Sequence, residues 1–566
     1  MEGFMSDVNV NRPWLKNYDK HVSPNLKYEE KCFADSFAQI VAKYPDKTAL
    51  IYLGSKLTFR DVDILANQLA HFFLKSGLKP DDVVGLHLPN IPAHYIGVLG
   101  AQKAGCVTTG LSPLLTAPEM AHQLNDSGTK IVLTVDVLYA KIAEVADKAP
   151  FTTVVVSEIA DFLPGIKRVL GKLLKKIPTA EVKPLAGKTV LRFTEIIKTM
   201  PKQSVAVKRG FDDNIFMMYT GGTTGPAKGA LLTQRSYMSN RQQTLTWLDI
   251  QADDIALSAF PLFHIAGLAL GGFTLTKGVT QICVPNPRDS HFLIEALKKY
   301  RPSFLVNVPT VFFELLKKPE FRALDLKGHL KWCLSAAAPF PAENIKELEA
   351  IIGEGNFIEL YGMTEMSPVM ICNPRIGKKK PGSIGMPISD TDVQLIDPET
   401  KNPPQTGEPG EIVIRGPQIM RGYYNQPAET ANAVRDGWMY TGDVAKMDED
   451  GYFYLVDRVK DMVIVSGFKV FTREIDDVLA KHRDVLMAAT IGMPDPERPG
   501  SERVGCAIVL REGVVKSDAE KEKIRAFLKE HIAPYKMPRV IEFMDELPTS
   551  GVGKILKREL RKIMAI

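Results

Sequence analysis

This 566-residue sequence has few cysteines, no long apolar run and only a small excess of positive charge. Each of these features excludes some classes of protein. The six cysteines are widely spaced and form no C-x-x-C pair, which indicates a reducing compartment and disfavours a structural zinc site. No segment offers the ~18 uninterrupted apolar residues of a membrane span. The N-terminal segment lacks the apolar core of a signal peptide, so we expect a cytoplasmic protein.

The balance of charged and apolar residues is that of a soluble globular protein. Hydrophobic residues make up 45% of the chain and charged residues 24%, and the net charge is only +5. The basic residues do not gather into one long tail, so nucleic acid is not an expected partner. At ~150 residues for each folding unit, the chain is long enough for about three or four units.

The segment YTGGTTGPAKG, residues 219–229, has the composition of a phosphate-binding loop. Its glycines let backbone N–H groups face phosphate oxygens, and its threonines and Lys228 add hydroxyls and an ammonium. Lys228 is followed by Gly229 and no glycine directly precedes it, so this is not the Walker A motif of a P-loop kinase or ATPase. A surface loop without a ligand is the alternative. We expect a buried strand to end at residues 217–219 and a helix to start from Leu231.

A basic amphipathic segment covers residues 162–177. Its apolar residues recur at helical spacing, and no acidic residue occurs from residue 162 to residue 180. The opposite face carries five cations: Lys167, Arg168, Lys172, Lys175 and Lys176. Such a helix can lie in the interface of an anionic bilayer, which predicts peripheral contact with the inner face of the cell membrane. An ordinary surface helix packed on the core is the alternative.

Strand and helix patterns alternate through the first two thirds of the chain. The expected strands are at residues 48–53, 83–88, 130–134 and 153–156, and an amphipathic helix is expected at residues 59–76. This alternation predicts an α/β fold with parallel sheets covered by helices. Further along, short β-type runs separated by Gly and Pro predict a β-rich subdomain, and a small mixed strand and helix pattern follows it.

Four further motifs follow the glycine-rich loop in order. They are IELYGMTE at residues 358–365, YTGD at 440–443, VDRVKDMVIVSGFKV at 456–470 and LPTSGVGKI at 547–555. In order and approximate spacing the set resembles the adenylate-forming superfamily of acyl-CoA synthetases, luciferases and peptide-synthetase adenylation domains. Within it, the chain is most similar to bacterial long-chain fatty acyl-CoA synthetases. The likeness extends over nearly the whole chain.

The resemblance implies a domain plan. A large N-terminal AMP-binding domain, residues 1–456, would contain two parallel-type α/β subdomains and a β-rich, barrel-like subdomain at residues 370–456. A hinge at residues 457–461 would lead to a small mobile α+β lid domain at residues 462–566.

The resemblance also implies a two-step ligase that uses ATP, a fatty acid, CoA and Mg²⁺. The acid and ATP would first give acyl-AMP and pyrophosphate, and the CoA thiol would then displace AMP to give acyl-CoA. A carboxylate is a poor electrophile, and AMP turns its oxygen into a leaving group. The attack on the α-phosphate requires cations and oriented donors to neutralise spread negative charge.

ATP and AMP binding would involve residues from four of the motifs and one alanine between them. They are Thr220, Gly221, Gly222, Thr223, Thr224, Gly225, Lys228, Ala337, Tyr361, Gly362, Asp443 and Arg458. By resemblance, Tyr361 would stack on adenine, Asp443 would bind the ribose hydroxyls, and Thr364 would act on the α-phosphate. Glu365, also catalytic, would bind Mg²⁺ with Thr224. A helix start at Thr364 and Glu365, and a salt bridge between Asp443 and Arg458, are the alternatives.

The resemblance assigns the two half-reactions to different parts of the C-terminal region. Lys554 would be the catalytic lysine of adenylation, although it would otherwise count as solvated charge. Lys460 would be the hinge about which the lid domain turns for thioester formation. CoA would bind at Ser466, Gly467 and Phe468.

The resemblance implies that the carboxylate pocket lies in PLFHIAGLALGG, residues 261–272. His264 would lie beside the acyl chain as a further catalytic residue, and a satisfied core histidine is the alternative. The acyl pocket itself is assigned to Ala266, Gly267, Leu268 and Gly271. Two departures bear on chain length. Leu268 stands where some long-chain members have an aromatic gate, and alanines replace glycines in SAAAPF, residues 335–340.

Other functions remain open at this stage. The chain could be a ligase for medium-chain or aromatic carboxylates, or could load acyl groups on a carrier protein. It could also be a membrane-peripheral acyl-CoA binding or scaffolding protein that has lost catalysis, which the intact Lys228, Glu365, Asp443 and Lys554 set disfavours.

Overall fold

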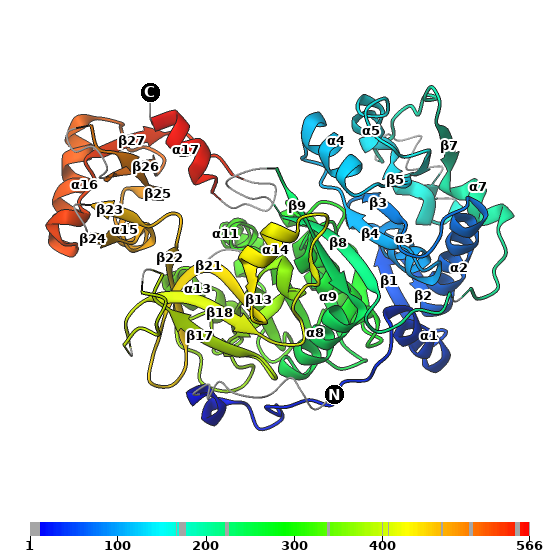
Figure 1. Cartoon of the computed structure of the whole chain (residues 1–566), viewed down its shortest axis with the longest axis horizontal. Coiled ribbons are helices and arrows are strands. Elements are labelled where there is room, and N and C mark those ends of the chain that lie inside the picture. Colours follow the sequence, from blue (N-terminus) through cyan, green and yellow to red (C-terminus); the bar gives the residue numbers. More distant parts are fainter. Residues whose placement is uncertain are drawn as a thin grey trace. The chain divides into compact units, whose positions relative to one another are not determined.

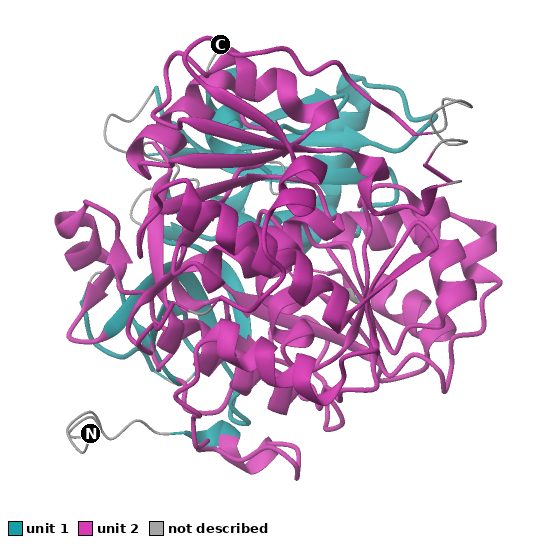
Figure 2. Cartoon of the chain, turned by 90° about the vertical axis from the view of Figure 1, so that its right-hand side faces the viewer, with its two compact units in different colours: residues 1–14, 392–414, 438–566 teal, residues 15–391, 415–437 magenta. Residues whose placement is uncertain are grey.

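The structure, a computed structural model, describes eleven stretches of the chain. They are residues 12–165, 167–168, 177–205, 207–220, 226–336, 340–398, 400–405, 407–465, 468–496, 502–549 and 555–564. The chain forms two compact units, which Figure 2 shows in different colours. The large unit comprises residues 15–391 and 415–437, and the small unit comprises residues 1–14, 392–414 and 438–566. The predicted hinge at residues 457–461 lies within the small unit and stays a prediction.

A nine-stranded sheet forms one half of the large unit (Figure 1). Its order is β16 (Met386–Pro387), β15 (Val369–Cys372), β14 (Phe357–Gly362), β13 (Trp332–Ser335), β12 (Phe304–Asn307), β10 (Ile255–Ser258), β11 (Thr280–Ile282), β1 (Thr48–Tyr52) and β2 (Ser55–Thr58). The strands from β14 to β1 run parallel, and antiparallel strands close both ends. The central strands are buried and rich in apolar residues, as expected of strands covered on both faces.

An eight-stranded sheet forms the other half of the large unit. Its order is β19 (Gly422–Tyr423), β9 (Lys228–Thr233), β8 (Asn214–Thr220), β4 (Val107–Gly110), β3 (Val83–His87), β5 (Ile131–Val135), β6 (Thr153–Ser157) and β7 (Thr189–Arg192). The strands from β8 to β7 run parallel, whereas β9 runs antiparallel to β8 and β19 runs antiparallel to β9. The alternation of strands and helices therefore correctly predicted parallel-type sheets, and the resemblance correctly implied two of them.

Helices cover these sheets and build the cores. Among the described residues of the large unit they are α1 (Phe33–Lys43), α2 (Phe59–Lys75), α3 (Pro92–Lys103), α4 (Ala117–Asp126), α5 (Tyr139–Glu144), α7 (Phe193–Thr199), α8 (Gln234–Trp247), α9 (Ile265–Leu275), α10 (Ser290–Tyr300), α11 (Pro309–Leu316), α12 (Pro319–Arg322), α13 (Ala342–Ile352) and α14 (Pro427–Ala433). Helices α10, α11 and α13 share one apolar core with the nine-stranded sheet. At the start of α2, Thr58 and Asp61 form a reciprocal capping box, which fixes where this helix begins.

The small unit contains an antiparallel sheet and an α+β part. The sheet includes β17 (Asp392–Ile396), β18 (Gly410–Arg415), β21 (Trp438–Met447) and β22 (Phe453–Arg458). The α+β part contains the hairpin β23 (Val463–Val465) and β24 (Phe468–Val470), the sheet β25 (Val485–Pro494), β26 (Glu502–Leu510) and β27 (Val540–Met544), and the helices α15 (Thr472–Leu479), α16 (Asp518–His531) and α17 (Lys557–Met564). The predicted β-rich stretch and the mixed C-terminal pattern are both confirmed.

One local prediction was wrong. The residues from Leu231 do not begin a helix, because Lys228–Thr233 form strand β9 and helix α8 starts at Gln234. Strand β9 pairs with β8 on one side and with β19 on the other. These tertiary hydrogen bonds decide the conformation of a run whose own pattern is ambiguous.

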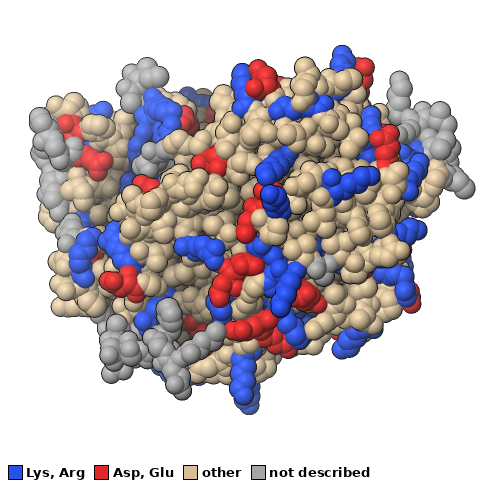
Figure 3. Space-filling model, turned by 45° about the vertical axis from the view of Figure 1, so that its right-hand side comes forward, with Lys and Arg blue, Asp and Glu red and all other residues tan. Residues whose placement is uncertain are grey.

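The membrane-related predictions are only partly covered by the structure. Among the described residues, no helix combines the length and the apolarity needed to cross a bilayer. Within the predicted interfacial segment, residues 166 and 169–176 lie outside the described residues, so that prediction stays open. Cations and anions are interspersed on the face drawn in Figure 3, in agreement with the small net charge. All six cysteines are buried and free.

Candidate active site

The glycine-rich loop joins two paired strands of the large unit. Thr220 at the end of β8 and Lys228 at the start of β9 are partners in the antiparallel ladder, so the loop between them is closed at its base. Its residues 221–225, which include the predicted Gly221, Gly222, Thr223, Thr224 and Gly225, lie outside the described residues. The ladder places Thr220 and Lys228 on either side of this loop.

Lys228 is held by two side chains that the motifs did not reveal. Its ammonium forms an ion pair with Glu429 on α14 and lies 5.2 Å from the centre of the Tyr423 ring on β19. The Lys228 side chain is 25% exposed and that of Glu429 is 44% exposed. Glu429 and Tyr423 therefore position the Lys228 ammonium at the end of the loop, where it remains partly accessible to a ligand.

The ELYGMTE segment runs from β14 into a short 3-10 helix, η4 (Thr364–Met366). A Cβ on Gly362 would lie 2.3 Å from the carbonyl oxygen of Pro368, so only glycine permits this close turn. Tyr361, Thr364 and Glu365 are 8%, 8% and 6% exposed. Helix η4 packs against β9, which brings Glu365 and Lys228 into one region of the large unit.

The Glu365 carboxylate suits a hard cation. Its Oε1 accepts a hydrogen bond of 2.8 Å from the Tyr423 hydroxyl, and among the described residues none donates to Oε2. Burial and the neighbouring Glu365 raise the pKa of Tyr423, so this hydroxyl remains a donor at neutral pH. A buried, oriented carboxylate supplies the oxygen ligand that Mg²⁺ prefers, and Glu365 therefore fits its predicted metal role.

Asp443 and Arg458 face each other across two strands of the small unit. They are register partners of β21 and β22, with Arg458 Nε 3.1 Å from Asp443 Oδ1. The turn before Asp443 needs Gly442 at a φ of +70°, and the Asp443 backbone N–H donates to Thr441 Oγ1 at 3.1 Å. The alternative of a salt bridge is thus realised in this structure. Ribose binding by Asp443 remains a prediction.

The predicted CoA segment forms the hairpin of β23 and β24. Ser466 and Gly467 lie outside the described residues. Phe468 is 57% exposed and stacks on Tyr535 with ring centres 4.9 Å apart. Lys554 also lies outside the described residues, next to a bridge between Thr549 and Ile555.

The predicted carboxylate segment is tightly packed at its helix start. His264 caps α9, since its Nδ1 accepts a hydrogen bond of 3.3 Å from the N–H of Ala266. A Cβ on Gly267 would lie 2.2 Å from the carbonyl oxygen of Pro261, and one on Gly271 would lie 3.1 Å from Tyr95. In this structure the space beside Gly267 is filled by the Pro261 backbone, and the space beside Gly271 is filled in part by the Tyr95 side chain. Leu268 is buried and Ala266 is half-buried, while Ala337 of SAAAPF lies outside the described residues.

Asn90 holds part of this segment in place, and the sequence motifs did not reveal it. Its amide donates to the Phe260 carbonyl at 2.8 Å and its oxygen accepts from the Leu262 N–H at 2.9 Å. Asn90 is only 4% exposed. The loop that leads to His264 is therefore held by one buried side chain from a distant part of the sequence.

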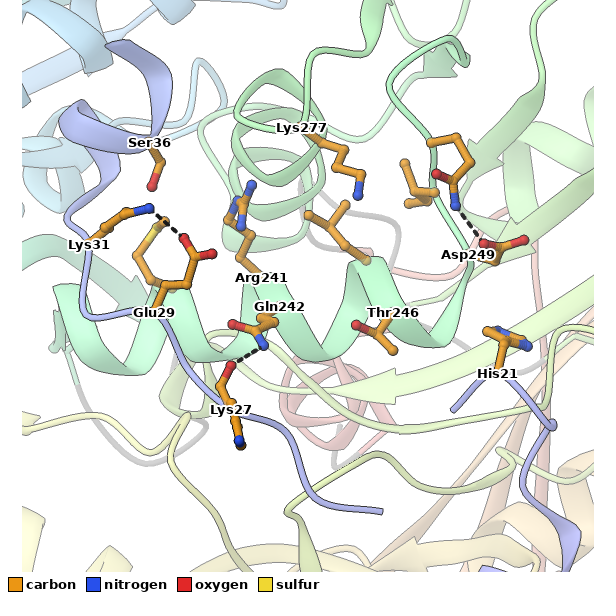
Figure 4. Close-up of a pocket in the computed structure, with 14 residues that line it drawn as sticks. His21, Lys27, Glu29, Lys31, Ser36, Arg241, Gln242, Thr246, Asp249 and Lys277 are labelled. Carbon is orange, nitrogen blue, oxygen red and sulfur yellow. Dashed lines mark hydrogen bonds and ion pairs between the residues drawn. The ribbon is translucent and has the colours of Figure 1, made fainter. Parts of the chain in front are cut away.

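A separate polar pocket of about 470 Å³ lies beside α8 (Figure 4). Figure 4 shows Lys31 paired with Glu29 and Gln242 bonded to the backbone of Lys27, on the side of α8 that faces the N-terminal segment. None of the predicted site residues lines this pocket.

Comparison with known families shows which family the chain belongs to. The family model described as AMP-binding enzyme matches residues 37–424, and the model described as AMP-binding enzyme C-terminal domain matches residues 474–554. The chain belongs to the AMP-binding enzyme family. The resemblance predicted from the five motifs is thereby confirmed, and the two matches of this AMP-binding enzyme cover both the glycine-rich loop and the segment that ends at Lys554.

Relatives of this AMP-binding enzyme include several CoA ligases. A long-chain-fatty-acid–CoA ligase of Bacillus subtilis (strain 168) is 35% identical over 562 residues, which cover 97% of each chain. A feruloyl-CoA synthase of an Amycolatopsis species is 34% identical over 521 residues, which cover 92% of this chain and 96% of the other. The solved anthranilate CoA ligase AuaEII, in complex with anthranoyl-AMP, has a TM-score of 0.83 at 25% identity and covers 95% of this chain and 98% of its own.

Proposed function

We propose that the chain is an ATP-dependent fatty acid:CoA ligase that prefers long-chain acids. The observation that carries this proposal is the link between Lys228 and Glu365 through Tyr423, directly beside the glycine-rich loop. A cation for phosphate and a carboxylate for a metal ion are there held in one place. The long-chain-fatty-acid–CoA ligase of Bacillus subtilis, similar over nearly the whole chain, supports the choice of substrate.

In the first half-reaction the acid carboxylate attacks the α-phosphorus of ATP, and the bond to pyrophosphate breaks. Lys228 and Thr220 hold the β- and γ-phosphates, and Thr364 contacts the α-phosphate. Asp443 accepts hydrogen bonds from the ribose hydroxyls, assisted by Arg458, and Tyr361 stacks on adenine. Lys554 donates to the oxygens that gain negative charge during the attack.

A bound Mg²⁺ would be held by Glu365 and Thr224, and its positive charge would neutralise phosphate oxygens. In the second half-reaction the CoA sulfur attacks the acyl carbonyl, and the carbon–oxygen bond to AMP breaks. The hairpin with Ser466, Gly467 and Phe468 contributes to CoA binding, and Lys460 serves as the hinge between the two half-reactions.

A substrate panel tests this function. Carboxylic acids of increasing chain length, supplied with ATP, Mg²⁺ and CoA, are scored for release of AMP and thioester. We expect the highest kcat/KM for long-chain acids. Absence of both products with every acid from C6 to C18 would reject the proposal.

Lys554→Ala tests the division between the half-reactions. The variant should lose formation of acyl-AMP and retain most thioester formation from supplied acyl-AMP, because its ammonium is needed only for adenylation. An equal loss in both half-reactions would contradict the assignment of Lys554.

An aromatic carboxylate is the second candidate substrate. The similarity to a feruloyl-CoA synthase favours this class of acid. Ferulate and benzoate in the same panel decide between the long-chain and the aromatic acid. Transfer to a carrier protein is tested by replacing CoA with a phosphopantetheine-loaded carrier.

Residues 162–177 are proposed to contact anionic membranes at the bilayer surface, on the strength of their cationic face. Flotation with vesicles that contain or lack anionic lipid tests this contact. Charge reversal at Lys167, Lys172 and Lys175 should abolish flotation. Flotation that persists in the charge-reversed variant would refute the contact.

A further inference from the structure

Tyr423 and Glu429 connect the two charged groups of the nucleotide site. The Tyr423 hydroxyl donates to Glu365 Oε1 at 2.8 Å, and the centre of the Tyr423 ring lies 5.2 Å from the Lys228 ammonium. The same ammonium is paired with the Glu429 carboxylate. One aromatic side chain thus separates the proposed metal ligand from the phosphate-binding cation, and a second carboxylate neutralises that cation.

Strand pairing fixes Tyr423 next to Lys228. In the β9–β19 ladder Tyr423 is the partner of Ala230, and the Tyr424 N–H donates to the Gly229 carbonyl at 2.8 Å. The Tyr423 N–H in turn donates to Thr430 Oγ1 at 2.8 Å. The backbone that carries the Tyr423 ring is therefore anchored to β9 on one side and to the Thr430 hydroxyl on the other.

Glu429 reaches Lys228 from the first turn of α14. This helix begins at Pro427, a residue whose fixed φ favours the first helical position. The Thr430 hydroxyl bonds both Gln426 and Tyr423, which ties the start of α14 to β19. The carboxylate is thus presented by a short, well-anchored element.

The ion pair of Lys228 with Glu429 is suited to exchange. Both side chains are partly exposed, and exposed ion pairs contribute little to stability, so the pair separates at low cost. A triphosphate at the glycine-rich loop would bring several negative charges toward the same ammonium. Like charges repel, so the Glu429 carboxylate and the phosphates compete for Lys228.

We propose that Tyr423 and Glu429 are positioning residues of the nucleotide site: Tyr423 holds Glu365 and Lys228 at a fixed separation, and Glu429 is the counter-ion of Lys228 that the nucleotide phosphates displace. This inference rests on the proposed function only in taking a nucleotide polyphosphate as the ligand. It does not depend on the carboxylic acid or on CoA.

Binding of ATP without metal tests the role of Glu429. Isothermal titration of the full chain with ATP in EDTA measures the dissociation constant in the absence of acid and CoA. Glu429→Gln should lower this constant about two- to fivefold, because the competing charge is gone. A structural defect would weaken binding instead, so the direction of the change separates the two explanations. Glu429→Ala should change the constant in the same direction.

The matched control is Glu314→Gln. Glu314 on α11 forms an exposed ion pair with Lys317, the residue after this helix, and its loss should leave ATP binding unchanged. An unchanged or higher dissociation constant for Glu429→Gln would overturn the role of Glu429. A wild-type chain that bound no ATP at all would reject the adenylating function itself, which is a different outcome.

Metal dependence tests the role of Tyr423. At fixed ATP, Mg²⁺ is titrated and its effect on ATP binding is followed by calorimetry, while Mn²⁺ binding is followed by electron paramagnetic resonance. Tyr423→Phe keeps the ring beside Lys228 and removes only the hydroxyl that orients Glu365. The metal concentration for half-saturation should rise about tenfold, as is usual when a partner of a ligand is removed, and metal-free ATP binding should change less than about twofold.

Tyr28→Phe is the control for Tyr423→Phe. The Tyr28 hydroxyl also donates to a carboxylate, that of Asp390, at 2.7 Å in the same unit. Its loss should leave metal dependence unchanged. Equal metal dependence in Tyr423→Phe and in the wild type would overturn the role of Tyr423.

Discussion

Asn90 offers a sharp test of how the loop before His264 is held. Substitution with alanine removes the donor to the Phe260 carbonyl and the acceptor for the Leu262 N–H. Phe260 and Leu262 are both 4% exposed, so water replaces these partners poorly. An unsatisfied buried polar group costs about 1–3 kcal/mol, and the two together should lower the free energy of unfolding by about 2–6 kcal/mol.

Asn125→Ala is the matched control. Its amide also makes two hydrogen bonds, to the carbonyls of Ala121 and Lys148 at 2.8 and 2.6 Å, but these bonds lie at the exposed surface. Water can take over both bonds, so we expect a loss below about 1 kcal/mol. Urea unfolding followed by tryptophan fluorescence compares the two variants.

Asn90→Ala should also affect binding of the acid substrate. If the loop positions the acid, Asn90→Ala raises KM for the acid while the dissociation constant of ATP stays within about twofold of the wild type. Equal unfolding free energies for Asn90→Ala and Asn125→Ala would refute the structural reasoning. An unchanged KM would remove the loop from the acid site.

Three further predictions concern single groups. Asp443→Asn should weaken ATP binding about tenfold by calorimetry, because a carboxylate accepts stronger hydrogen bonds from the ribose than an amide does, and unchanged affinity would contradict ribose binding. Gly267→Ala should lower the unfolding free energy by about 1–3 kcal/mol because its Cβ would lie 2.2 Å from the Pro261 oxygen, whereas Gly210→Ala, with its nearest neighbour at 3.7 Å, should have little effect. Burial raises the pKa of Asp476 from 3.8 to about 6, so the folded chain binds a proton in this interval that the unfolded chain does not. The melting temperature of the wild type should therefore fall relative to that of Asp476→Asn as pH rises from about 4 to about 6.5. A difference in melting temperature that stays constant over this range would refute the pKa shift.

The sequence revealed the parts of the site that act through local spacing. Lys228 and Glu365 lie in short motifs whose residues are close in the chain, and the structure places both motifs in one region. Tyr423 and Glu429 could not be found in this way, because only the β9–β19 ladder brings them to Lys228. A lone tyrosine and a lone glutamate carry no spacing signal for such a contact.

For the fold too, the sequence did not reveal features that depend on contacts between distant parts of the chain. Short β-type runs predicted β1 in the nine-stranded sheet and β3, β5 and β6 in the eight-stranded sheet, since their mostly apolar residues are buried irrespective of neighbours. The run at Leu231 was misassigned because its partners on β8 and β19 lie elsewhere in the chain. Asn90 was missed for a related reason, because the groups it bonds are backbone atoms of a distant loop.

The contacts around Lys460 show which interactions would break if the chain turned at this proposed hinge. Before it, the Asp457 carboxylate accepts hydrogen bonds from the backbone N–H and the hydroxyl of Thr472, the latter at 2.8 Å. After it, Asp461 pairs with Arg561 at 2.8 Å, and both would move together. Rotation about Lys460 would separate Asp457 from Thr472, which is fully buried, and hydrogen bonds to a charged group contribute about 1.5–3 kcal/mol each. A ligand can shift such an equilibrium only by its difference in affinity for the two states, so this loss is one of the costs that exchange of pyrophosphate for CoA must help to offset.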